Sequence, residues 1–192
     1  MTRSVILASG SPRRHALFKE CCNDFKVMLP AIPNENLNAN LPLEKALEDL
    51  ALRKAESVAE DKPKAVVVGA DTVVVHQGNV LGKPVDEEDA LNMLRSLLAC
   101  THNVITAWAV VCQETGWRRT GHCVSTVYFN DATDESLMRY ISGGEPMDKA
   151  GGYAIQGEGA FLINRFEGSY NNIVGLPVED VCHVVREARA LL

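Results

Sequence analysis

The chain has 192 residues, of which 46% are hydrophobic and 23% charged, the balance of an ordinary globular protein. Its formal net charge of −6 argues against broad binding to DNA, RNA or anionic membranes. No apolar run reaches the roughly 20 residues that a membrane-spanning helix needs, and the N-terminal segment turns polar too quickly for a signal peptide. An anionic ligand would therefore require positive charge concentrated at one place.

The cysteine and histidine patterns predict neither a metal site nor cross-links. No C-x-x-C pair or zinc spacing occurs among the six cysteines: Cys21, Cys22, Cys100, Cys112, Cys123 and Cys182. The five histidines are scattered without an H-x-x-x-H pair, so a zinc site is not expected. This pattern favours reduced, mostly packed thiols in a cytoplasmic protein.

The first feature in chain order is a short apolar run, Ser4 to Ala8, followed by a turn of small residues and a helical segment. Ser11 is a natural N-cap, and Pro12 suits the first helical position. A strand, a small-residue turn and a capped helix form an anion site, because free N–H groups and the positive helix end point at one spot. Arg13 and Arg14 oppose the helix dipole but suit phosphate oxygens. The alternative is a plain capped helix with solvated arginines.

A second strand is predicted at Phe25 to Leu29, followed by an Asn- and Pro-rich loop whose one acid is Glu35. Pro42 to Glu60 has helical periodicity, and its apolar stripe carries Lys54 near the middle. A lysine on a core-facing stripe either extends to an edge or meets an anion in a cleft. The periodicity alone leaves both interpretations open.

The central stretch is Ala65 to Val75, a nearly unbroken β-branched run interrupted in its middle by GADT. Such a run predicts a strand covered on both faces. An ionised Asp71 inside this strand is unfavourable unless cations, a metal or several donors hold it, so we expect positive charge nearby. The turn HQGN then returns the chain through Val80 to Pro84 and could bring Lys83 close to Asp71, although the sequence does not fix the hairpin register.

The rest of the chain alternates helices and strands, which predicts an α/β protein with a mixed sheet. The predicted helices begin at Asp86, at Thr133 or Asp134, and at Pro177. The predicted strands span His102 to Cys112, His122 to Phe129 and Ala160 to Phe166, and a loop follows at Gly168 to Asn172. No internal repeat or linker is visible, so we expect a single domain over residues 1–192, with two lobes.

A glycine-rich run occupies Met147 to Gly159. Its four glycines imply tight turns or close backbone approach to another group. The run lacks the G-x-G-x-x-G spacing after a strand, so it is not a dinucleotide-binding loop. Lys149, Tyr153 and Gln156 within it could select a nucleobase by hydrogen bonding and stacking. The alternative is a purely structural loop.

Five motifs, taken together, resemble the Maf family. They are LASGSPRR (Leu7 to Arg14), ADTVV (Ala70 to Val74), LGKP (Leu81 to Pro84), DKAGGYAIQG (Asp148 to Gly157) and GSYNNIVGLP (Gly168 to Pro177). That family consists of nucleoside triphosphate pyrophosphatases that share an architecture with the inosine triphosphatase-like proteins. The resemblance implies an elongated mixed β-sheet flanked by helices, with two lobes around a central cleft. It also implies hydrolysis between the α- and β-phosphates, which yields a monophosphate and pyrophosphate.

The resemblance further implies roles for individual residues. Asp71 matches the catalytic acid, and the family's cleft lysines are matched by Lys54 and Lys83. The phosphate-binding turn is matched by Ser9, Ser11, Arg13 and Arg14, and positions associated with substrate choice by Arg13, Thr72 and Gln156. The pattern at Thr72 and Gln156 is similar to the subfamily that acts on dTTP and UTP.

Two departures from the family pattern matter. In the first loop the family places an acid directly after Ile-Asp or Ile-Glu, whereas this chain has Ile32-Pro33-Asn34-Glu35. Counting from the first strand puts Asn34 at that position, and a one-residue insertion would restore Glu35, which we take as the matching acid. The second departure is Ala99 to His102, where the family tends to show Ser-Gly before a His. That difference weakens any functional role assigned to this turn and does not affect the residues of the cleft.

The residue types support this chemistry. A triphosphate is strongly anionic, and the local cations would be Arg13, Arg14, Lys54, Lys83 and Lys149. Asp71 and Glu35 could hold Mg²⁺ or Mn²⁺, because both ions favour oxygen ligands. We therefore predict Asp71, Lys54, Lys83 and Glu35 as catalytic residues, with Asp71 and Glu35 as metal ligands. The predicted substrate-binding residues are Ser9, Ser11, Arg13, Arg14, Thr72, Lys149 and Gln156.

The prediction is a cytoplasmic dTTP/UTP pyrophosphatase whose partner is a nucleoside triphosphate and not a nucleic acid polymer or a membrane. A homodimer stays open, because the sequence does not determine the oligomeric state. Two alternatives remain: a non-catalytic nucleotide-binding or regulatory module, and a phosphatase that releases orthophosphate from small phosphate esters.

Overall fold

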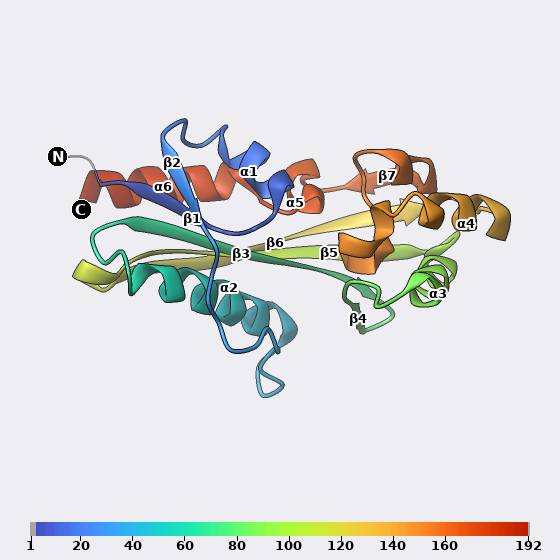
Figure 1. Ribbon diagram of the computed structural model, residues 1–192, viewed down its shortest axis with the longest axis horizontal. Coiled ribbons are helices and arrows are strands. Elements are labelled where there is room, and N and C mark those ends of the chain that lie inside the picture. Colours follow the sequence, from blue (N-terminus) through green and yellow to red (C-terminus); the bar gives the residue numbers. More distant parts are fainter. Residues whose placement is uncertain (1–2, 192) are drawn as a thin grey trace. The chain divides into compact units, whose positions relative to one another are not determined.

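The computed structural model describes residues 3–191 as an α/β protein (Figure 1). Its strands are β1 (Val5–Ala8), β2 (Phe25–Met28), β3 (Val66–His76), β4 (Asn79–Leu81), β5 (Thr101–Cys112), β6 (Trp117–Phe129) and β7 (Ile163–Glu167). They form one sheet in the order β2-β1-β3-β5-β6-β7, with β4 paired to β3. β1 is parallel to β2 and β3, whereas β4 is antiparallel to β3 and β7 is antiparallel to β6. The predicted mixed sheet is therefore confirmed.

The α-helices of the described residues are α1 (Pro12–Phe18), α2 (Leu43–Ala59), α3 (Glu87–Leu97), α4 (Asp134–Ser142), α5 (Tyr170–Val174) and α6 (Val178–Leu191). The predicted N-caps Ser11 and Asp86 are confirmed, because each side chain accepts a hydrogen bond from a backbone N–H three residues later. Thr133 caps α4 in the same way. None of the helices within residues 3–191 is long and apolar enough to cross a membrane.

The described residues divide into two compact units. Unit 1 comprises the chain up to Asp71, Thr106–Cys123 and the chain from Gly175 onward, and unit 2 comprises Thr72–Ile105 and Val124–Val174. Strands β3, β5 and β6 contribute residues to both units. Two compact units agree with the predicted two lobes, whereas a single domain with a cleft stays a prediction.

In unit 1, α2 packs closely on β3 at Gly69. A Cβ atom there would lie 2.3 Å from the carbonyl oxygen of Ala51 and 2.8 Å from the backbone nitrogen of Ala55. Ala51 and Ala55 are themselves fully buried, so small residues on both elements permit this approach. The core-facing stripe predicted for α2 is confirmed by the burial of Leu47, Leu50, Ala51 and Val58. This close contact places the next turn of α2 beside the continuation of β3.

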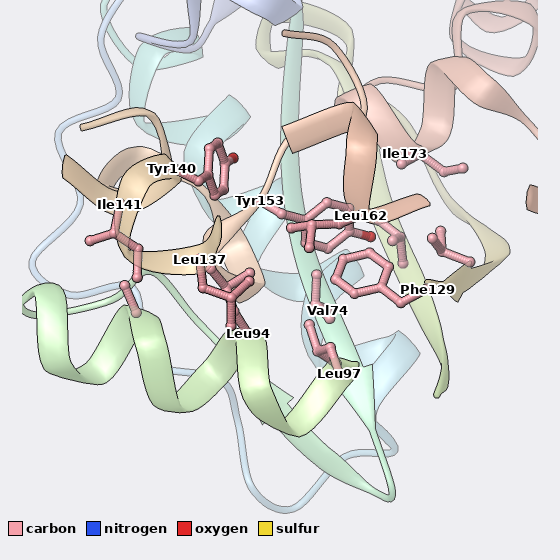
Figure 2. Close-up of a cluster of buried hydrophobic side chains, with 13 residues drawn as sticks. Val74, Leu94, Leu97, Phe129, Leu137, Tyr140, Ile141, Tyr153, Leu162 and Ile173 are labelled. Carbon is pink, nitrogen blue, oxygen red and sulfur yellow. The ribbon is translucent and has the colours of Figure 1, made fainter. Parts of the chain in front are cut away.

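Unit 2 has its own apolar core (Figure 2). It is formed by residues of α3, α4, α5, β3, β5 and β6, together with Tyr153 and Leu162. The rings of His102, Phe129 and Tyr153 meet edge to face in this core, with centroids 4.7 to 5.3 Å apart. Tyr153 belongs to the glycine-rich run, so this run is attached to the core and does not lie loosely on the surface.

Two predicted elements of unit 2 are wrong. The strand predicted from Ala160 begins only at Ile163, because Glu158–Leu162 form a 3₁₀ helix. The loop predicted at Gly168 to Asn172 runs into helix α5, where the buried Asn172 amide donates to the carbonyl of Val104 at 3.0 Å and the hydroxyl of Ser125 at 2.8 Å. These tertiary hydrogen bonds stabilise helical turns that the local sequence disfavours.

The prediction of reduced cysteines is wrong for one pair. Cys21, just after α1, and Cys182, in α6, form a disulfide with their Cα atoms 4.8 Å apart. They are 161 residues apart in sequence, so only the tertiary fold brings them together. The thiols of Cys22, Cys100 and Cys112 are free, as predicted.

Reduction of this disulfide is expected to lower the thermal stability. Opening a closed loop of this length raises the entropy of the unfolded chain, and such a loss is typically about 2–4 kcal/mol. For a chain of this size that corresponds to a fall of about 5–15 °C in Tm. Calorimetry with and without reductant measures the shift, and Cys182→Ser should start from the lower Tm and not respond to reductant. Cys100→Ser is the matched control and should behave as wild type; a wild-type Tm that reductant leaves unchanged contradicts the prediction.

Candidate active site

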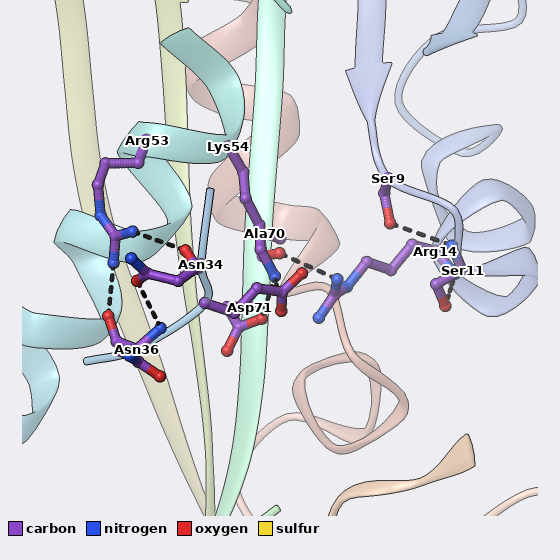
Figure 3. Close-up of polar contacts among 10 residues, drawn as sticks. Ser9, Ser11, Arg14, Asn34, Asn36, Arg53, Lys54, Ala70 and Asp71 are labelled. Atoms are coloured by element: carbon purple, nitrogen blue, oxygen red, sulfur yellow. Dashed lines mark hydrogen bonds and ion pairs between the residues drawn. The ribbon is translucent and has the colours of Figure 1, made fainter. Parts of the chain in front are cut away.

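The turn between β1 and α1 is built as the sequence predicts. The hydroxyl of Ser9 accepts a hydrogen bond from the backbone N–H of Ser11 at 3.2 Å (Figure 3). The hydroxyl of Ser11 accepts one from the backbone N–H of Arg14 at 3.4 Å. His15, which the sequence analysis did not single out, lies with Nε2 2.7 Å from the carbonyl oxygen of Ser9. Since a carbonyl only accepts, this nitrogen is the protonated one. The turn is therefore held by three of its own polar contacts.

Arg14 joins this turn to β3. Its Nε donates to the carbonyl of Gly175 at 2.7 Å, and Nη1 donates to the carbonyl of Ala70 at 2.9 Å. Burial lowers the pKa of Arg14, and the negative charge of Asp71 opposes that effect. Two guanidinium nitrogens thus hold backbone carbonyls, and phosphate binding by Arg14 stays a prediction. The guanidinium brings positive charge to the backbone directly before Asp71.

The centre of the site is a lysine shared by two carboxylates (Figure 3). Lys54 Nζ lies 2.7 Å from Asp71 Oδ1 and 2.7 Å from Glu35 Oε2. The side chain of Lys54 is only 7% exposed, that of Asp71 is 16% exposed, and that of Glu35 is 64% exposed. The cation predicted beside Asp71 is therefore Lys54, and this lysine meets anions inside the protein and does not extend to an edge.

Packing of α2 explains how Lys54 reaches Asp71. Gly69 lies against Ala51 and Ala55, so the two backbones are close enough for the lysine, on the same helix, to meet the carboxylate two residues farther along β3. The ammonium group is desolvated there, and the two carboxylates replace its water. A larger side chain at position 69 would separate the elements and leave the charges unpaired.

Arg53 places Glu35, and sequence reasoning missed this residue. Its Nη1 donates to the carbonyl of Asn34 at 3.1 Å, and Nη2 donates to the carbonyl of Asn36 at 2.8 Å, so the two contacts bracket Glu35. Nε donates to Asp49 on the same helix at 3.0 Å, which holds the guanidinium in place. The Asn34 side chain accepts from the Asn36 N–H at 3.1 Å, and this Asn-Glu-Asn turn was a local signal that could have indicated the arrangement.

Arg13 lies in α1 of unit 1, and the remaining predicted site residues belong to unit 2. Gly151 N–H donates to the carbonyl of Gly82 at 2.9 Å, so the segment that carries Lys83 is attached to the glycine-rich run. Lys149 Nζ donates to the carbonyl of Glu145 at 2.9 Å and also pairs with Asp148. Lys83 and Gln156 are exposed, and Thr72 directly follows Asp71 along β3. The placement of Lys83, Lys149 and Gln156 against Asp71 stays a prediction.

The two carboxylates fit a divalent cation whose coordination is completed by substrate and water. Mg²⁺ is usually bound through one or two carboxylates together with substrate phosphates and waters, and not by an all-protein cage. Glu35 and Asp71 share one ammonium group, so their oxygens lie in the same small region. Within residues 3–191 no group of three or more His, Cys, Asp or Glu side chains could hold a metal, so these two residues would supply only part of its coordination.

Comparison with known proteins shows the family of this chain. The profile of the family described as Maf-like protein matches residues 4–188. The dTTP/UTP pyrophosphatase of Desulforamulus reducens is 42% identical over 184 residues, which is 96% of each chain. The dTTP/UTP pyrophosphatase of a Geobacillus species is 43% identical over 192 residues, which is 98% of each chain. A HAM1 protein from Coxiella burnetii has a solved structure with a TM-score of 0.49 and 13% identity, over 96% of this chain and 99% of its own.

Proposed function

This chain belongs to the Maf family, and from that membership we propose that it is a nucleoside triphosphate pyrophosphatase acting on dTTP and UTP. The resemblance indicated by the five motifs is thereby confirmed. Because the curated relatives match nearly the whole chain, the proposal concerns the chain as a whole. The reaction would hydrolyse the anhydride between the α- and β-phosphates and release the monophosphate and pyrophosphate.

The observation that supports this proposal most is the ammonium group of Lys54 between Asp71 and Glu35. A desolvated cation beside a carboxylate provides both groups that hydrolysis of an anhydride needs: one to bind the proton of water and one to neutralise charge on the phosphoryl group. In a partly buried site such interactions are stronger than in bulk water.

In this mechanism Asp71 orients the attacking water and accepts its proton. Lys54 lies 2.7 Å from the Asp71 carboxylate and would stabilise the charge that develops on the phosphoryl oxygens. A divalent cation, Mg²⁺ or Mn²⁺, would be held by Asp71 and Glu35 and would supply further neutralisation of the phosphates. Arg14, whose Nη1 donates to the carbonyl of Ala70, adds positive charge next to Asp71.

Substrate binding would use the other predicted residues. Ser9, Ser11 and Arg13 would bind the phosphates at the turn after β1, and Lys83 and Lys149 would add positive charge. Thr72 and Gln156 would contact the nucleobase, and the amide of Gln156 is exposed and able to pair with a ligand. A net charge of −6 makes such local cations necessary for an anionic substrate.

The proposal includes the cellular setting expected from the sequence. The partner is the nucleoside triphosphate, without a nucleic acid polymer or a membrane, and a homodimer stays open. The cytoplasm is the proposed location, where the disulfide of Cys21 and Cys182 would be exposed to reduction.

A nucleotide panel tests the proposed function directly. With Mg²⁺ or Mn²⁺ present, dTTP and UTP should yield pyrophosphate, with kcat/KM at least about tenfold above that for CTP and dATP, because a site that pairs with one base edge rejects others. Separate assays of pyrophosphate and orthophosphate identify which anhydride bond is cut. Orthophosphate as the first product would indicate a phosphatase, and tight nucleotide binding without product would indicate a non-catalytic module.

A further inference from the structure

The segment Tyr153 to Gly159 is anchored on both sides of Gln156. The side chain of Gln156 is exposed, whereas Tyr153 and Ala154 before it and Gly159 after it are buried. Exposed loop segments of this composition are ordinarily mobile. In this segment, by contrast, specific contacts hold the residues on both sides of Gln156.

After Gln156, the anchor is the carboxylate of Glu145. It accepts hydrogen bonds from the backbone N–H of Glu158 at 3.0 Å and of Gly159 at 3.1 Å. Gly157 has φ of 94°, and a Cβ atom there would lie 2.5 Å from Glu145 Oε2. Only glycine suits both this backbone conformation and this close approach. The carboxylate thus determines the path of the chain immediately after Gln156.

Before Gln156, the anchor is the pair of Tyr153 and His102. The phenol oxygen of Tyr153 lies 2.7 Å from His102 Nε2, and the two residues are 5% and 2% exposed. Burial, together with the nearby His76, lowers the pKa of His102 to about 4, so the imidazole is neutral at physiological pH. Its Nδ1 is buried without a hydrogen-bond partner among residues 3–191. The pair therefore holds Tyr153 through one hydrogen bond and the packing of its ring.

Tyr140, which lies in the apolar core of unit 2, connects the two anchors. Its hydroxyl donates to Glu145 Oε1 at 3.0 Å and receives a hydrogen bond from the backbone of Ala154. Burial raises the pKa of Glu145, but the backbone N–H donors and Tyr140 outweigh it and lower the net value, so the group is ionised at neutral pH. Glu145 is thus linked to the chain on both sides of Gln156.

Glu145 also holds one of the proposed substrate lysines. Lys149 Nζ donates to the backbone carbonyl of Glu145 at 2.9 Å. One residue that the sequence analysis did not single out therefore contacts the segments that carry both Lys149 and Gln156.

We propose that Glu145 is a positioning residue that orients Gln156 for nucleobase selection, with Tyr140 and the pair of His102 and Tyr153 as its supports. The proposal rests on the proposed function, because Gln156 selects a base only if a nucleotide binds. Selection by hydrogen bonds depends on placing a polar group within a fraction of an ångström. Loosening this segment should therefore reduce discrimination between bases and change the chemical step little, because Asp71 and Lys54 belong to unit 1.

Equilibrium binding of non-hydrolysable α,β-methylene analogues of UTP and CTP tests the proposal. Glu145→Gln keeps the side-chain size but turns an amide N–H₂ toward a backbone donor, so a hydrogen bond is lost. The ratio of the CTP-analogue Kd to the UTP-analogue Kd should fall about tenfold or more, since a misplacement of about 1 Å alone can cost about 10²-fold. Glu88→Gln, an exposed acid of the same unit, removes the same charge and should keep the wild-type ratio.

Tyr140→Phe is the second variant, because it keeps the ring in the core and removes only the hydroxyl between Ala154 and Glu145. It should also lower the ratio of the two Kd values, by a smaller factor. If Glu145→Gln does not fold, this variant alone tests the proposal. A lower Tm with an unchanged ratio in the folded variants would show a purely structural role and overturn the proposal, as would a wild-type protein that binds both analogues equally. Failure of the proposed function is separate: it would appear as binding of natural UTP without pyrophosphate release.

Discussion

Asp71→Asn is expected to reduce kcat/KM for dTTP and UTP by about 10³-fold, because single electrostatic groups of this kind contribute about 10²–10³-fold in rate. The amide keeps the size of the carboxylate but can neither accept a proton from water nor hold a cation with full charge. Lys54 would keep its contact with Glu35, at 2.7 Å in the wild type, so the fold should persist. Pyrophosphate release with saturating Mg²⁺ measures the effect.

Asp61→Asn is the matched control for this experiment. Asp61 is an exposed acid of the same unit, in the turn after α2, so its variant should retain wild-type turnover. Circular dichroism and Tm of Asp71→Asn should remain close to those of the wild type. Retention of half of the wild-type rate by the Asp71 variant would remove this residue from the mechanism.

Lys54→Met is expected to lose both activity and stability. Removing the ammonium leaves Asp71 and Glu35 without their shared cation and takes away a charge that stabilises the phosphoryl group, at about 10²–10³-fold in rate. An unpaired, largely buried Asp71 is expected to lower the free energy of unfolding by about 2–3 kcal/mol, below the 3–5 of fully buried pairs because Glu35 is exposed. That corresponds to about 5–10 °C in Tm.

Thermal unfolding and pyrophosphate release test both parts of this prediction. Lys62→Met, at an exposed position of the same unit, removes one positive charge elsewhere and should leave rate and Tm near the wild-type values. A Lys54 variant that keeps its rate within a few-fold of the wild type would mean that the ion pair is structural and that phosphate charge is neutralised by other cations.

Much of the local structure follows from the sequence. Ser11 and Asp86 cap the helices that they were predicted to cap, since a cap needs only N–H groups two or three residues away. The mixed sheet follows from the alternation of strand and helix patterns. The need for a cation at Asp71 is equally local, because an ionised group in an apolar strand is unfavourable by itself.

Other elements depend on contacts that no local pattern contains. The 3₁₀ helix at Glu158–Leu162 includes the first three residues of a predicted strand, and Glu145 accepts the two backbone N–H groups at its start. Asn172 helps to convert a predicted loop into α5 through a buried hydrogen bond to Val104, which is 68 residues away. In both cases a tertiary partner outweighs the local preference of the chain.

The sequence by itself determined which residues could form the site, and the five motifs identified the family. Only the tertiary structure decided that Lys54 is the cation at Asp71, that Arg14 holds backbone carbonyls, and that Cys21 pairs with Cys182. The physical reason is that these contacts depend on how closely two elements pack, as at Gly69 against α2, and packing is a property of distant residues together. Periodicity and caps describe neighbours along the chain, whereas charge pairing in the site describes neighbours in space.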